Sequence, residues 1–115
     1  MKKRESKDIE SELYGIHAEM CKVFSHPKRL ELINILRDHE YNVSELARKL
    51  DITVGNLSQH LTMMKQRRVL LTCKEGNEVF YRLANPKLLK AFDLIREILA
   101  EQIEHNGLLL KKAKQ

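Results

Sequence analysis

One face of the segment 54–68 carries side chains that are able to read the edges of DNA bases. If Leu57, Leu61 and Met64 turn inward, a helical step of about 100° per residue turns a polar and uncharged face outward. This outward face consists of Gly55, Asn56, Gln59, Thr62 and Gln66, with Ser58 at its flank. Amide groups pair bidentately with adenine, and hydroxyl groups bond to any base or to a phosphate. The pattern predicts a helix that reads a major groove, and the alternative is a helix face that is merely solvated.

A short helix and a tight turn precede this face, and they favour the first interpretation. Ser44 is predicted to cap a helix from Glu45 to Leu50, and Thr53 is predicted to cap the helix that follows. Two helices joined by so short a turn form a helix-turn-helix. Asp51 stands at the turn position that is usually glycine, and aspartate tolerates the left-handed backbone conformation better than most residues.

Apolar periodicity and turn residues predict the elements on either side. The predicted order is a helix over 8–24, a helix over 28–38, the helix-turn-helix, strands over 70–74 and 79–83, and a last helix over 86–105. Gly76-Asn77 suits the turn of a hairpin, and Asn106-Gly107 is expected to end the last helix. The expected fold class is therefore mainly α with a small β-hairpin, a winged helix-turn-helix in the order α-α-α-α-β-β-α.

Length and charge limit the class of protein. The 115 residues fit one domain over 8–105, between a basic arm over 1–7 and a basic tail over 106–115. Within the near-neutral domain, residues 43–82 carry seven basic and four acidic residues, a local charge that favours nucleic acid as the partner. No apolar run approaches the ~20 residues of a membrane span, and no secretory segment opens the chain. A cytoplasmic protein without a membrane partner is expected.

We expect double-stranded DNA to contact the outward helix face, the basic end of that helix and the hairpin. The expected DNA-binding residues are Gly55, Asn56, Ser58, Gln59, Thr62, Lys65, Arg67, Arg68, Lys74, Asn77 and Arg82. Contacts to base edges specify the sequence, whereas contacts to phosphates position the protein. The helix 54–68 is therefore expected to read the operator, and the hairpin to hold the phosphates as a wing.

The last predicted helix carries more apolar residues than one domain needs. Ten of the sixteen residues from Leu88 to Ile103 are apolar, so one side is able to face its own domain and another side a partner. We therefore expect a homodimer through helices 8–24 and 86–105. The expected interface residues are Ile9, Leu13, Ile16, Met20, Phe92, Ile95, Leu99 and Ile103.

Four stretches, through their order and spacing, carry a resemblance to a known family. They are Met20-Cys21-Lys22-Val23-Phe24-Ser25-His26-Pro27-Lys28-Arg29-Leu30, Ser44-Glu45-Leu46-Ala47, Leu57-Ser58-Gln59-His60-Leu61 and Lys74-Glu75-Gly76-Asn77-Glu78-Val79-Phe80-Tyr81. Over roughly residues 16–104 the chain resembles the ArsR family of winged-helix repressors. The resemblance implies a homodimer built from the first and last helices, operator binding by the helix 54–68, and release of DNA when an effector binds.

Two metal sites that members of that family use are not intact in this sequence. Where many members have a Cys-x-Cys pair for soft metals or arsenite, this chain has Asn42 and Ser44. Asp93 matches the first ligand of the other site, on the last helix, but Ile95 stands where a histidine ligand is needed. We therefore predict no cofactor and no metal at either site, and the effector stays unidentified.

The histidines leave one metal hypothesis open. His17 and His105, together with Glu101 or Glu104, would form a site across the dimer interface, although exposed helical Glu and His pairs are more often solvated. His60 lies at the edge of the inward face of its helix, where a histidine is usually a hydrogen-bonded packing residue. A metal-sensing role is thus the less favoured interpretation of these residues.

Two other classes of function compete with a DNA-binding regulator. A winged helix also serves as a protein-interaction module, and in that case the outward face would not bind DNA specifically. An enzyme is not expected, because the sequence pairs no nucleophile with a base and has neither a glycine-rich phosphate loop nor a carboxylate dyad. Cys21 and Cys73 are predicted to be reduced thiols, and a redox switch at either is the open alternative. The favoured function is a transcriptional regulator, most simply a repressor.

Overall fold

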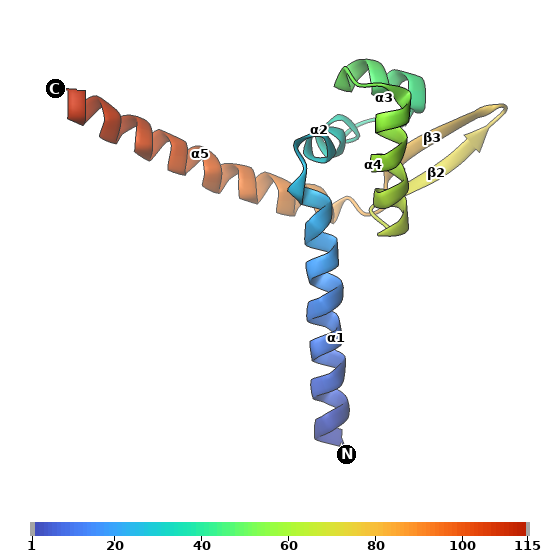
Figure 1. The fold of residues 1–115 in the computed structure, drawn as a ribbon, viewed down its shortest axis with the longest axis horizontal. Helices are drawn as coiled ribbons and strands as arrows, with labels where there is room; N and C mark the ends of the chain where they lie inside the picture. The colour runs from blue at the N-terminus through green and yellow to red at the C-terminus, as the bar shows by residue number, and fades with distance from the viewer. Residues whose placement is uncertain (1, 115) are drawn as a thin grey trace. The chain divides into compact units, whose positions relative to one another are not determined.

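A computed structural model of the chain describes residues 2–114, with side chains described for residues 7–107. The chain consists of two compact units, Met1–Ala84 and Asn85–Gln115. The elements, drawn in Figure 1, are α1 (Lys2–Lys22), the 3-10 helix η1 (Val23–Ser25), α2 (Pro27–Ile35), β1 (Tyr41–Asn42), α3 (Val43–Leu50), α4 (Val54–Gln66), β2 (Leu70–Glu75), β3 (Glu78–Leu83) and α5 (Lys87–Lys114). The predicted winged helix-turn-helix is confirmed, with one short strand added.

The core of the first unit holds α3 and α4 in place. Its most deeply buried side chains are Leu32, Ile33, Leu46, Leu50, Leu57, Met64, Leu70 and Val23. They come from η1, α2, α3, α4 and β2, because the apolar residues of each helix recur on one face. Burying one leucine contributes on the order of 1.5–3 kcal/mol, so the packed helix pair forms a stable platform for whatever its outer face binds.

The turn between α3 and α4 has the predicted geometry. Asp51 has a left-handed backbone, with φ 53° and ψ 50°, and its N–H donates to the Arg48 carbonyl oxygen at 3.2 Å. Thr53 caps α4, because its Oγ1 accepts the N–H of Asn56 at 3.1 Å. Both features fix the direction in which α4 leaves the turn.

The start of α3 differs from the prediction. Asn42 Oδ1 accepts the Glu45 N–H at 2.9 Å, so Asn42 caps the helix and the predicted cap at Ser44 is wrong. The segment before the helix is the unpredicted strand β1, in which Tyr41 pairs with Tyr81 of β3. An asparagine at an N-cap satisfies a free N–H group as well as a serine does. Residue type alone therefore does not locate the start of α3.

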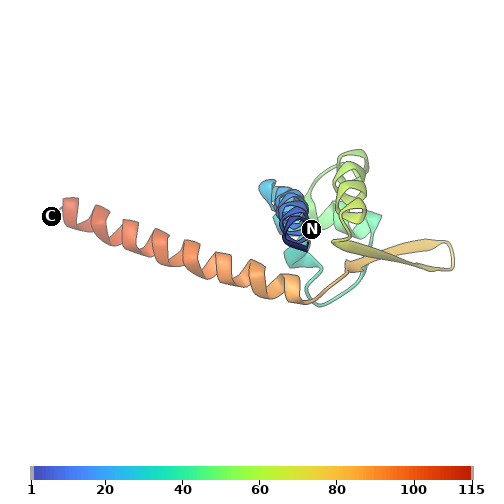
Figure 2. The same ribbon diagram turned by 90° about the horizontal axis from the view of Figure 1, so that it is seen from below.

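The wing is a tight antiparallel hairpin in a three-stranded sheet of order β1-β3-β2. Its register pairs Leu70 with Leu83 at the base and Glu75 with Glu78 at the tip. Gly76 takes φ 63° in the turn, a left-handed conformation that favours glycine. Figures 1 and 2 both show β2 and β3 extending beyond α4, which makes the tip accessible.

The terminal helices are longer than predicted. α1 begins at Lys2, so the described part of the expected arm over 1–7 is helical. α5 continues through Asn106 and Gly107 to Lys114, so the expected stop is wrong and the described part of the tail is helical. A glycine inside a helix costs only about 1 kcal/mol relative to alanine, and the leucines and lysines that follow are good helix formers. Within residues 2–114, no helix is both long and apolar enough to cross a membrane.

Candidate nucleic-acid interface

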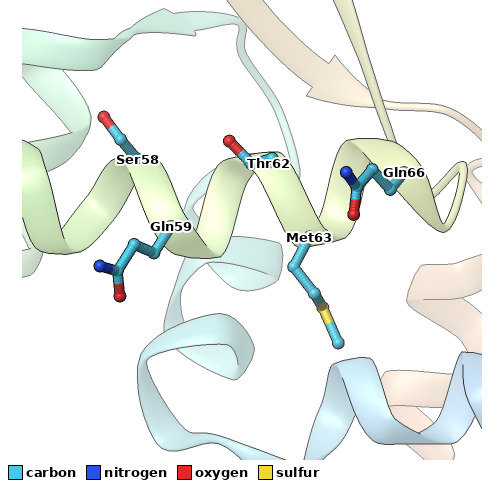
Figure 3. Close-up of a pocket in the computed structure, with 5 residues that line it drawn as sticks. All are labelled: Ser58, Gln59, Thr62, Met63 and Gln66. Atoms are coloured by element: carbon cyan, nitrogen blue, oxygen red, sulfur yellow. The ribbon is translucent and has the colours of Figure 1, made fainter.

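The outward face of α4 is exposed, and the opposite face is buried. The exposed polar residues of the outward face are Asn56, Ser58, Gln59, Thr62 and Gln66. Figure 3 shows Ser58 and Thr62 on one side of this face and Gln59 and Met63 on the other. Together with Gln66 these four residues line an open hollow of about 400 Å³. The position of Met63 in this hollow could not be predicted from the sequence, because its neighbour Met64 fits the inward apolar pattern.

The first turn of α4 leaves its backbone open. A Cβ atom added at Gly55 would meet no atom within 4 Å, so packing within the chain does not require a glycine there. The amino-terminal end of a helix carries partial positive charge and N–H groups that suit a phosphate. A glycine at this place therefore leaves room for a phosphate group to approach the helix closely.

The expected phosphate-binding residues lie at the end of α4 and on the hairpin. The exposed residues Lys65, Arg68, Lys74 and Asn77 lie at the end of α4, just beyond it, or on the hairpin. Arg68 has φ 60°, which is unusual for a residue with a side chain. Arg82 Nε lies 4.0 Å from Glu40 Oε1, at the limit of an ion pair. The basic groups thus gather beyond the carboxyl end of α4 and along the wing.

Arg67 forms an ion pair that the sequence did not reveal. Its Nη2 lies 2.8 Å from Glu19 Oε2, which links the loop after α4 to α1. Glu19 also accepts a hydrogen bond from Lys22 Nζ at 2.9 Å. The Lys22 hydrogen bond and the charge of Arg67 lower the pKa of Glu19. Arg67 therefore has a competing carboxylate within the chain, in contrast to the role expected for it at a phosphate.

His60 is a packing histidine, as predicted. It is 8 % exposed and is the buried polar side chain of α4. Its Nδ1 lies 3.4 Å from Nη1 of Arg29 in α2, and its ring centroid lies 4.6 Å from that of His26. Burial lowers the pKa of His60, and the charges of His26 and Arg29 act in the same direction. The role of Arg29 could not be predicted from the sequence, because no short-range pattern connects residues 31 positions apart.

Two helices carry exposed apolar seams. On α1, the side chains of Ile9, Leu13 and Ile16 are between 59 % and 65 % exposed. On α5, the exposed apolar residues are Leu94, Ile95, Ile98, Leu99 and Ile103. Phe92 differs from its neighbours, since it is 7 % exposed and the Arg96 guanidinium lies 5.2 Å from its ring centroid. A partner would therefore meet little of the Phe92 ring.

Metal and thiol chemistry has no developed site within the described residues. Among residues 7–107, no three His, Cys, Asp or Glu side chains gather closely enough to hold a metal ion. Cys21 and Cys73 are free and exposed. The hypothesis of a site from His17 and His105 draws on two chains and stays a prediction.

The comparisons with known proteins agree with the fold and with the position of the helix-turn-helix. The sequence profile described as bacterial regulatory protein, arsR family, matches residues 26–70. The biofilm growth-associated repressor of Agrobacterium fabrum is 34 % identical over 88 residues, which cover 76 % of this chain and 75 % of the relative. The Vibrio cholerae transcriptional activator HlyU is 28 % identical over 82 residues, covering 71 % and 76 %. This chain is a winged-helix transcriptional regulator.

A solved structure of a second repressor supports the same assignment. PagR of Bacillus anthracis has a TM-score of 0.65 and 31 % identity, with 74 % of this chain and 98 % of that chain covered. A homodimeric winged helix-turn-helix domain from Mycobacterium bovis has a TM-score of 0.78, and its 23 % identity supports the fold alone. The chain belongs to the ArsR family of bacterial regulatory proteins.

Proposed function

We propose that this protein is a cytoplasmic homodimeric repressor that binds a specific double-stranded DNA operator. In this proposal α4 enters the major groove, and the wing contacts the phosphates on either side. The observation that carries it is the uncharged polar face of α4, whose amide and hydroxyl side chains are exposed while the other face is buried. Amides and hydroxyls of this kind form the hydrogen bonds that distinguish base pairs in the major groove.

The dimer is proposed from the apolar seams of α1 and α5, each considered by itself. Large apolar side chains that are half exposed along a helix favour a protein partner, because water is a poor environment for them. A second copy supplies an identical seam, and a two-fold dimer would present two α4 helices to two half-sites. The M. bovis domain of the same fold, which is described as homodimeric, is consistent with this arrangement.

Repression rather than activation is proposed from the relatives. The A. fabrum and B. anthracis proteins are named repressors, whereas the V. cholerae protein is named an activator. A small domain that covers an operator blocks access to it without further machinery. Catalysis is not part of the proposal, since the family consists of transcriptional regulators.

An electrophoretic shift at two salt concentrations tests the proposal. The probes are the DNA upstream of the protein's own gene and a random duplex of equal length. We expect the upstream DNA to bind more tightly at both salt concentrations, because base contacts persist when salt weakens the phosphate contacts. Equal binding of both probes would support the alternative of a protein-interaction module, and the proposal would then be wrong.

A further inference from the structure

Arg29 lies where three parts of the first unit meet. Its Nε donates to the Val23 carbonyl oxygen at 2.9 Å, and its Nη2 donates to the Lys22 carbonyl oxygen at 3.0 Å. Its Nη1 lies 3.4 Å from Nδ1 of His60 in α4. One guanidinium therefore contacts the end of α1, the 3-10 helix η1 and the helix that carries the DNA-reading face.

The contact with Arg29 defines which nitrogen of the neutral His60 ring carries the proton. A guanidinium has only donors, so His60 Nδ1 must accept and the ring proton must lie on Nε2. The adjacent His26 ring also accepts through Nδ1, from the Lys28 N–H at 3.1 Å. A second proton on His60 would turn its Nδ1 into a donor that faces another donor. The contact between α2 and α4 thus depends on a neutral ring.

The surroundings of His60 oppose that second proton. The ring is 8 % exposed, and burial is the first cause that lowers the pKa of His60. The charged or titratable groups that act on it from neighbouring elements are His26, before α2, and Arg29, on α2. Because the pKa in the folded chain lies below the ordinary value of about 6.5, the neutral-ring contact is fully present above that pH. It weakens progressively as the pH falls through the lowered pKa.

Base reading is sensitive to the position of α4. A binding site works only when its groups are held within about 0.5 Å of the productive geometry. Gln59 directly precedes His60 in α4. The residue that contacts Arg29 therefore lies in the same helical turn as an exposed amide. A change at the His60 contact is therefore expected to move or loosen the exposed face.

We propose that Arg29 is a positioning residue for DNA recognition, which fixes α4 to the end of α1 through a neutral His60 ring. This inference rests on the proposed DNA-binding function. Neither Arg29 nor His60 contacts DNA in it. Arg29 acts on specificity, because it determines where the base-reading side chains lie, and acidification releases the contact.

The test measures a ratio of affinities against pH. The probes are a duplex that the full-length protein selects from a random-sequence library and a random duplex of equal length. Both are measured at fixed ionic strength, from pH 8 down to the lowest pH at which circular dichroism still shows a folded protein. We expect the affinity for the selected duplex, divided by the affinity for the random duplex, to fall roughly tenfold as the pH falls. A fall of this size corresponds to the loss of one hydrogen bond to a charged group. The ratio removes any effect of pH that acts equally on the two duplexes.

Three variants separate the proposed role from a merely structural one. His60→Asn keeps an acceptor close to the position of Nδ1 and cannot gain a proton, so its ratio should stay constant with pH. Arg29→Lys keeps the charge but cannot hold two carbonyls and the ring together, so its ratio should be low already at pH 8 and should not fall further. His39→Asn removes an exposed histidine and should retain the wild-type profile.

The outcomes are distinguishable. A wild-type ratio near one at pH 8 would contradict the DNA-binding function itself. A ratio well above one that does not change with pH, or a His60→Asn protein that keeps the wild-type slope, would overturn the role of Arg29 alone. If His60→Asn does not fold, as judged by circular dichroism, the Arg29→Lys profile decides, because a purely structural contact would change the melting temperature and leave the ratio of the folded protein intact.

Discussion

The exposed faces of α4 and α1 differ in chemistry, although both belong to amphipathic helices. α4 buries Leu57 and Leu61 in the core and turns amides and hydroxyls to the solvent. α1 instead leaves Leu13 and Ile16 more than half exposed. Exposed amides are well solvated, whereas exposed leucine and isoleucine keep an unfavourable contact with water. The difference indicates that α4 buries its apolar face within one chain and exposes a face that suits a polar ligand. α1 instead exposes apolar side chains that suit an apolar partner.

A pair of leucine truncations should show the largest difference between the two helices. Leu57→Ala is expected to lower the free energy of unfolding by about 2–5 kcal/mol, because it leaves a cavity in a packed core. Leu13→Ala should change the stability only at protein concentrations where the dimer forms. Urea titrations at two protein concentrations check both. A concentration-independent loss of equal size for Leu13→Ala would mean that α1 packs within its own chain.

A charge on α5 should break the dimer. Ile95→Asp or Leu99→Asp is expected to yield monomers, since burying an unpaired charge in an interface costs several kcal/mol. Ala100→Asp is the control, because it places the same charge on an exposed position of the same helix, about 140° around the helix axis from Ile95 and about 100° from Leu99. Sedimentation velocity reports the mass of each variant. Ile95→Asp and Leu99→Asp proteins that both remain dimeric would exclude this face of α5 from the interface.

The basic residues should affect affinity without affecting specificity. Arg68→Ala or Lys74→Ala is expected to weaken binding to operator and random DNA alike, and to reduce the salt dependence by about 0.9 of a unit of slope for each phosphate that the side chain neutralises. Lys90→Ala, on α5, serves as the control variant. Fluorescence anisotropy at four salt concentrations gives the slope. An unchanged slope in both variants would remove these residues from the interface.

The smallest effect is expected for Glu19→Gln. This change removes the carboxylate that competes for Arg67, so binding to random DNA should become slightly tighter and more dependent on salt. Because the pKa of Glu19 is lowered, the ion pair contributes at pH values above the ordinary range of glutamate and disappears as the pH falls through the lowered pKa. Weaker binding by the variant would show that the ion pair positions Arg67 for DNA instead of competing for it.

The helix-turn-helix could be predicted because its determinants are local. Apolar spacing in α4, the Thr53 cap and the tolerance of Asp51 for a left-handed backbone all act within a few residues. The exposed face of α4 follows directly from that spacing. The length of α5 could not be predicted, because a short Asn-Gly signal was outweighed by helix formers on both sides.

The contacts that modify the candidate site were beyond the sequence. The Arg67 and Glu19 ion pair and the Arg29 and His60 contact join residues far apart in the chain, and they depend on how the helices pack. The strand β1 escaped prediction for a similar reason, because two residues form no periodic pattern and their pairing with β3 is a tertiary contact. Sequence therefore indicated which side chains face outward, and packing determines which of those are already engaged.

Direct reading of bases by α4 is the central claim, and atom-specific changes in the DNA test it most directly. In a duplex selected by the protein, each adenine in turn is replaced by 7-deazaadenine, which removes the N7 acceptor that an amide side chain uses. We expect one such replacement to cost the wild-type protein about 1–3 kcal/mol and to cost Gln59→Ala or Asn56→Ala much less, because that variant already lacks the amide that would bind N7. If every replacement costs the variants as much as it costs the wild-type protein, these amides do not read adenine N7 and the account of the α4 face is contradicted.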